Sequence, residues 1–135
     1  MFVTSIIGNY NIITDEISWV NAGHQPALIR DNDGKFAEFE SKSPPLGIIK
    51  QGTKSNYFVN KSKLNGYRFY AFTDGLSESL NKDGKEIGID GSINIIEETY
   101  NKDTNKQLDD ITRSVMDTTK NQKLTDDLTV ISIGK

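Results

Sequence analysis

Acidic side chains lie next to two β-rich runs that are far apart in the chain. Asp74 follows the apolar run at residues 68–72, and Asp126 and Asp127 begin a second run that extends to residue 133. Short runs of this kind, bounded by turn residues, predict buried strands, and Gly75 predicts a turn with positive φ. If the two strands are antiparallel neighbours, about 5 Å apart, Asp74 shares one sheet edge with the acid pair. Only one of Asp126 and Asp127 can then face Asp74, because successive side chains alternate between faces.

Two carboxylates that close repel one another unless a proton or a cation lies between them. The chain has no cysteine and a single histidine, so oxygen ligands are expected, which favours Mg²⁺ or Mn²⁺ over zinc. Glu78 either hydrogen-bonds these ligands from outside or is a charge at a helix start, and the sequence does not separate the two readings. We therefore expect a metal site built on Asp74 and one acid of the pair.

The single histidine, His24, has two interpretations. It could be the general acid that protonates a leaving alkoxide. Alternatively, its ring could bond neighbouring backbone and hold a loop between two strands. We favour the second interpretation because Gly23 and Pro26 around it predict a tight loop. Asn21 has the same pair of interpretations, with its amide either tying this loop down or supporting the metal ligands.

Composition limits the classes of protein that this chain can belong to. Its 135 residues predict a single domain at positions 1–135. The net charge is −3 and no basic block occurs, which argues against nucleic acid or an anionic membrane as a partner. The start lacks the basic residues of a signal peptide, and no apolar run approaches the roughly 20 residues that span a bilayer. We expect a cytoplasmic protein.

The order of the predicted elements places strands first and helices later. Strands are expected at residues 2–7, 17–21, 27–30, 35–40, 57–60 and 68–72, and in the run that ends at residue 133. A short helical turn is expected at residues 76–80. One helix would carry Ile89, Ile93, Ile96 and Tyr100, and a second, capped by Thr104, would carry Leu108, Ile111, Val115 and Met116 and end at residues 120–123. This order predicts an α+β fold with an antiparallel sheet.

Four short motifs in order resemble the metal-dependent (PPM-type) serine/threonine phosphatases. They are NAGHQP at residues 21–26, PLG at 45–47, TDGL at 73–76 followed by Glu78, and DDLT at 126–129. The resemblance is to the bacterial branch of stage II sporulation and sigma-factor-regulating phosphatases. It implies an antiparallel β-sandwich flanked by helices, with two divalent metals at one end whose bound water attacks a phosphoserine or phosphothreonine. It also implies that Asp74 and Asp126 are metal ligands, whereas Asp127 matches a position that tolerates other residues.

The departures from this family pattern bear on activity. The resemblance implies a Gly-Asp strand and an Asp-x-Ser-Gly-His-Gly motif, which supply the bridging aspartate, before the region where this sequence begins. Neither occurs in these residues, and Tyr67 stands where an aspartate is usual. We therefore expect the C-terminal two-thirds of the domain, incomplete at its N-terminus. It should bind at most one Mg²⁺ or Mn²⁺, weakly, and be nearly inactive alone.

Two function classes remain open, and whether this chain is itself an enzyme is left undecided. One is part of a phosphatase that acts on a phosphoprotein regulator in bacterial signalling. The other is a non-catalytic protein-interaction module on the same scaffold. Residues 1–7 are apolar and β-prone, so we also expect a homodimer through that strand or a neighbouring sheet face.

Overall fold

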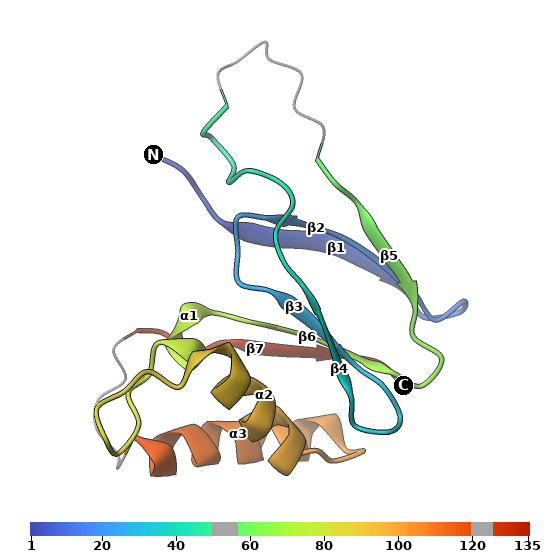
Figure 1. Ribbon diagram of the computed structural model, residues 1–135. Coiled ribbons are helices and arrows are strands. Elements are labelled where there is room, and N and C mark those ends of the chain that lie inside the picture. Colours follow the sequence, from blue (N-terminus) through green and yellow to red (C-terminus); the bar gives the residue numbers. More distant parts are fainter. Residues whose placement is uncertain (50–56, 120–125) are drawn as a thin grey trace. The chain divides into compact units, whose positions relative to one another are not determined.

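A computed structural model describes residues 1–49, 57–119 and 126–135 (Figure 1). The chain divides into two compact units: the first comprises Met1–Ala71 with Ile133–Lys135, and the second comprises Phe72–Ser132. No helix in the described part of the chain is long and apolar enough to cross a membrane. The helix end expected at residues 120–123 lies outside the described residues.

Two antiparallel sheets contain the seven strands of the described residues. The first has the order β1-β2-β5 and the second the order β4-β3-β6-β7. The strands are β1 (Ser5–Asn11), β2 (Glu16–Ala22), β3 (Ala27–Arg30), β4 (Phe36–Phe39), β5 (Asn60–Lys63), β6 (Arg68–Phe72) and β7 (Val130–Ile133). The division between the units passes through β6 and β7, so each of these strands has residues in both.

The core of the first unit lies between residues from both sheets. Side chains at alternate positions of β2, such as Ile17 and Trp19, are buried, as expected for a strand with one face on a core. The Trp19 ring packs edge-on against Phe39 of β4 at 5.2 Å and Phe69 of β6 at 5.1 Å, between ring centroids. These contacts join the two sheets, and the predicted antiparallel α+β sandwich is confirmed.

Two strands begin later than the sequence predicts. The bounds expected for the strand at residues 2–7 are wrong, because β1 begins at Ser5 and continues to Asn11, which pairs with Glu16. Before it, Val3 forms only an isolated bridge to Leu46. The strand expected at residues 57–60 is instead β5, whose bounds are set by pairing with the first four residues of β2. Pairing with a partner strand, rather than local β-propensity, decided both boundaries.

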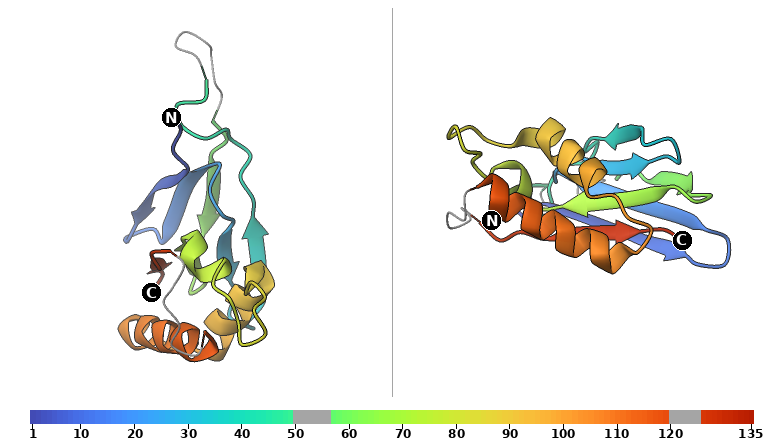
Figure 2. Two further views of the ribbon diagram at one scale, coloured as in Figure 1. Left: turned by 90° about the vertical axis from the view of Figure 1, so that its left-hand side faces the viewer. Right: turned by 90° about the horizontal axis from the view of Figure 1, so that it is seen from below.

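The described residues of the second unit form three helices: α1 (Asp74–Ser77), α2 (Gly88–Glu98) and α3 (Thr104–Thr118). α2 and α3 lie next to each other (Figures 1 and 2). The buried Gln107 of α3 donates from Nε2 to the Ile96 carbonyl of α2 at 3.1 Å. The prediction that Thr104 caps α3 is wrong. The Asp103 carboxylate accepts hydrogen bonds from the backbone N–H groups of Asn105 and Lys106, which makes Asp103 the N-cap.

Candidate metal-binding edge

Backbone and hydroxyl hydrogen bonds of Thr73 join the end of β6 to the start of β7. Its N–H donates to the Thr129 carbonyl at 3.0 Å, and its Oγ1 accepts from the Thr129 N–H at 2.9 Å. The same hydroxyl donates to the Asp127 carbonyl at 2.8 Å. The Asp74 segment and the segment 127–129 therefore lie at one edge, as predicted from the two runs. The role of Thr73 was not predicted from the sequence, although its position directly before the Asp-Gly pair was a signal for it.

Gly75 permits this close approach. A β carbon added at residue 75 would lie 2.4 Å from the Asp127 carbonyl oxygen and 2.7 Å from the Asp127 carbonyl carbon. The expectation of a positive φ at Gly75 is wrong, since this glycine lies within α1 and is not among the positive-φ residues. Glycine is required here because the backbone at Asp127, just before β7, occupies the space that a side chain at residue 75 would fill.

The acidic side chains of this edge, the three aspartates and Glu78, are exposed. Asp74 lies in the first turn of α1, and Glu78 is the C-cap of the same helix, its N–H bonded to the Asp74 carbonyl at 2.7 Å. Asp126 Oδ1 accepts from the Asp127 N–H at 2.7 Å. The edge thus presents carboxylates from two segments that are distant in sequence.

The side chains of this edge are oxygen donors of the kind that a hydrated divalent ion takes. Among the described residues, no group of three or more His, Cys, Asp or Glu side chains is placed to hold a metal. Asp74 and Asp126 are hard oxygen donors that suit Mg²⁺, which keeps most of its waters and takes one or two protein carboxylates.

The loop at residues 22–26, in the first unit, is held by Asn21. This side chain is 1% exposed; its Nδ2 donates to the Gln25 carbonyl at 2.8 Å and its Oδ1 accepts from the His24 N–H at 2.9 Å. Gly23 adopts φ +71° against the Pro45 ring and donates its N–H to Ser41 Oγ at 2.7 Å. The interpretation of Asn21 as a loop brace is confirmed.

His24 occupies this loop but does not bond in the expected way. Its backbone N–H, rather than its ring, makes the hydrogen bond to Asn21. The ring Nδ1 is buried and has no hydrogen-bond partner in the described part of the chain. A hollow of about 410 Å³ adjoins it, lined by residues 23–26 with Glu40 and Ser41. The tight loop is therefore confirmed, and the expectation that the ring bonds backbone is not met at Nδ1.

Comparison with known proteins agrees with this architecture. The family model described as stage II sporulation protein E (SpoIIE) matches residues 1–134. Phosphoserine phosphatase RsbU of Bacillus subtilis is 28% identical over 85 residues, which are 62% of this chain and 25% of that protein. The chain thus spans about a quarter of the length of this curated relative.

Two solved structures show the same fold. One contains the PP2C phosphatase domain and a fragment of the regulatory domain of SpoIIE from Bacillus subtilis, with a TM-score of 0.76 and 18% identity. The match covers 96% of this chain and 36% of that chain. The other is RsbX in complex with magnesium, with a TM-score of 0.59, 19% identity and coverage of 96% and 54%. Because the family model matches residues 1–134, this chain belongs to the stage II sporulation protein E family.

Proposed function

We propose that this chain forms part of the catalytic domain of a metal-dependent protein serine/threonine phosphatase that acts on a phosphoprotein regulator in bacterial signalling. The observation that carries the proposal is the Thr73 bonding that sets Asp74 beside the segment of Asp127. The activity of the relative RsbU, a phosphoserine phosphatase, and the magnesium in the RsbX structure support the same class of reaction.

In this proposal, Asp74 and Asp126 hold Mg²⁺ or Mn²⁺, and Asp127 and Glu78 hydrogen-bond the ion's waters. When bound, the ion supplies charge neutralisation at the phosphate and a water of lowered pKa. Asn21 holds the backbone of the loop at residues 22–26. His24, in the first unit, is kept only as the candidate that the sequence offers for protonating the leaving serine or threonine oxygen.

Two carboxylates without a shared third ligand should not assemble two ions, so turnover by residues 1–135 alone should be near background. The test measures hydrolysis of a phosphoserine peptide with and without Mn²⁺. It compares residues 1–135 with a chimera that places the part of RsbU preceding the matched residues before Met1. We expect Mn²⁺-dependent turnover in the chimera and its loss in the Asp74→Asn chimera. Robust Mn²⁺-dependent turnover by residues 1–135, or an active Asp74→Asn chimera, would contradict the proposal.

The alternative is a non-catalytic interaction module on this scaffold. It is favoured by the lack of a three-ligand group among the described residues. The two functions separate in the same experiment, because an interaction module would leave the chimera inactive at every Mn²⁺ concentration while its fold, followed by circular dichroism, stays intact.

The partner that we propose is a second copy of this chain, in a two-fold homodimer through the N-terminal residues. β1 is an edge strand without a charged residue, and Phe2, Val3 and Ile7 are 61%, 54% and 58% exposed. Unguarded strand edges pair with other chains, and closed homo-oligomers are most often dimers. Light scattering at micromolar concentration should give the dimer mass for the wild type and for Ile13→Lys in the β1–β2 turn. Ile7→Lys should give a monomer. A monomeric wild type would contradict this part of the proposal.

A further inference from the structure

A hollow of about 440 Å³ lies on the three-stranded sheet of the first unit. We call it the outer groove. Three strands contribute its lining: Asn9 and Asn11 from β1, Glu16, Ile17 and Ser18 from β2, and Lys61, Ser62 and Lys63 from β5. The volume falls within the range of about 300–1,000 Å³ that is typical of ligand sites.

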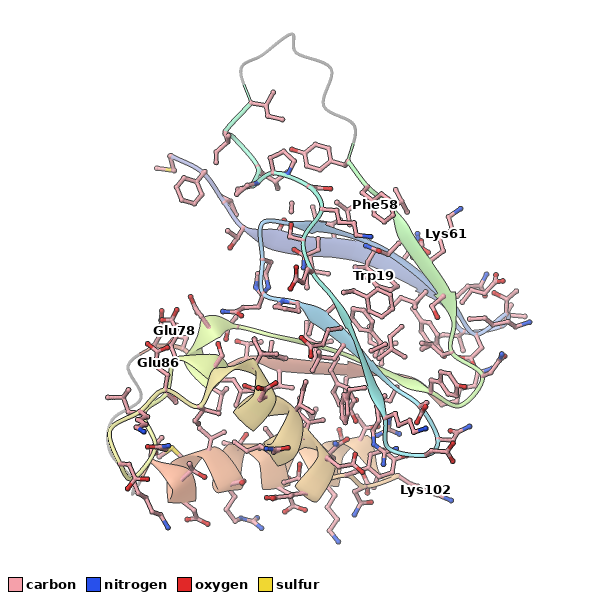
Figure 3. All side chains as sticks on the ribbon, in the orientation of Figure 1. Trp19, Phe58, Lys61, Glu78, Glu86 and Lys102 are labelled. Atoms are coloured by element: carbon pink, nitrogen blue, oxygen red, sulfur yellow. The ribbon has the colours of Figure 1, made fainter. Side chains whose placement is uncertain are left out.

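The strand register arranges most of these residues in two parallel rows. Asn9 pairs with Ser18, and Ser18 pairs with Lys61; two positions along, Asn11 pairs with Glu16, and Glu16 pairs with Lys63. Because Ile17 and Trp19 of β2 face the core, Ser18 and its row face the opposite side of the sheet. Figure 3 shows Lys61 directed away from Trp19.

Asn11 and Glu16, which share a row with Lys63, already make hydrogen bonds to nearby residues. Asn11 Oδ1 accepts from the N–H groups of Ile13 and Thr14, and Glu16 Oε2 accepts from Thr14 Oγ1 at 2.9 Å. The two lysines are different: within the described residues, neither Lys61 nor Lys63 has a carboxylate close enough for an ion pair. The outer groove therefore presents two exposed ammonium groups beside the amide of Asn9 and the hydroxyl of Ser18.

The spacing of the lysines indicates the shape of a ligand. Lys61 and Lys63 alternate along one strand, so their side chains leave the same face about 7 Å apart. Acidic side chains at alternate positions of an extended peptide have the same repeat. The chain as a whole carries a net charge of −3, so an acidic peptide is repelled by most of the molecule and attracted at this pair.

We propose that the outer groove binds an extended acidic peptide segment of a partner protein. Its aspartate or glutamate residues at alternate positions pair with Lys61 and Lys63, and the Asn9 amide and Ser18 hydroxyl bind its polar groups. Charged residues on an edge strand also discourage strand pairing, since β5 is at the edge of its sheet. Guarding the edge requires neither a hollow nor a particular spacing of charges, and the experiment separates the two roles by spacing.

The test measures fluorescence anisotropy of labelled peptides with residues 1–135. The probe alternates threonine and glutamate over eight residues; a second peptide has the same composition in two blocks, and a third has glutamine in place of glutamate. We expect the alternating peptide to bind most tightly, with a Kd that rises with salt. Lys61→Ala with Lys63→Ala should weaken it about tenfold, because each exposed ion pair is worth about threefold to fivefold.

The matched control removes two lysines elsewhere. Lys82→Ala with Lys85→Ala, in the exposed loop before α2, loses the same charge and should change the Kd less than about twofold. Lys61→Arg with Lys63→Arg should retain binding. Equal losses in the two alanine pairs, equal affinity for the blocked peptide, or no binding at millimolar protein would overturn the proposal. Aggregation of the Lys61/Lys63 alanine variant with unchanged peptide affinity would assign these lysines to edge protection instead.

Discussion

The loop at residues 22–26 and the edge at Asp74 use polar side chains in opposite ways. In the loop, both polar atoms of the buried Asn21 side chain bond to backbone groups, so the amide serves to hold the loop conformation. At the edge, Thr73 and the backbone hold the segments together, while the carboxylates of Asp74 and Asp127 remain exposed. The difference indicates which groups are available for a ligand: the side chains at the edge, but not the amide in the loop.

Among the changes that test this comparison, Gly75→Ala should lower the free energy of unfolding most. The added carbon would meet the Asp127 carbonyl, which belongs to backbone and cannot rotate away. We expect a loss of about 3 kcal/mol in the free energy of unfolding, measured by urea denaturation. Gly84→Ala, where the space is open but φ is +73°, should cost about 1 kcal/mol from backbone strain alone. A Gly75→Ala variant as stable as Gly84→Ala would show that α1 and the Asp127 backbone can move apart without loss of stability.

Asn21→Ala should be the next most damaging change. It leaves the His24 N–H and the Gln25 carbonyl without their partners, which should cost about 2 kcal/mol. Asn21→Asp keeps the acceptor for the His24 N–H and should recover part of this loss. The measurement is again urea unfolding, combined with the NMR signals of the His24 ring. A loss below about 0.5 kcal/mol would mean that the amide does not brace the loop.

Thr73→Val tests whether the threonine holds the edge. The variant keeps the shape and removes both hydroxyl hydrogen bonds, to the Asp127 carbonyl and from the Thr129 N–H. Because the site is partly exposed, we expect a loss of about 1 kcal/mol in the free energy of unfolding and a weaker affinity for Mn²⁺. Thr112→Val on the exposed face of α3 is the control and should be nearly neutral. Equal stability of the two variants would remove Thr73 from the account of this edge.

Asp74→Asn should have the smallest effect on stability and a specific effect on metal binding. Its carboxylate is exposed, so the free energy of unfolding should change by less than about 0.5 kcal/mol. Calorimetric titration of the wild type with Mn²⁺ should give a Kd of about 1 mM or weaker, as expected for two carboxylates, and no detectable heat in the variant. Asp83→Asn is the control. Micromolar affinity that survives Asp74→Asn would place the ligands elsewhere.

Local patterns predicted the elements whose boundaries depend on nearby residues. The strands expected at residues 27–30 and 35–40 are β3 and β4, joined by a turn with Gly34 at φ +83°, and Ile111 and Val115 form the predicted buried stripe of α3. Boundaries that depend on a distant partner were displaced. β1 ends where Glu16 pairs with Asn11, and the cap of α3 moved by one residue because the Asp103 carboxylate, rather than the Thr104 hydroxyl, reaches the free N–H groups.

The sequence alone determined the chemistry available to this protein: oxygen ligands without cysteine, one histidine in a Gly-Pro loop, and acids at the ends of two β-rich runs. Only the tertiary structure decided how those groups are held. Thr73 and Gly75 bring together two segments that are more than 50 positions apart. Pairing of β5 with β2 places Lys61 and Lys63 in the outer groove. The physical reason is that hydrogen bonds and close backbone contacts between distant residues produce no periodic pattern in the sequence. Side-chain chemistry and turn residues, in contrast, follow directly from residue type.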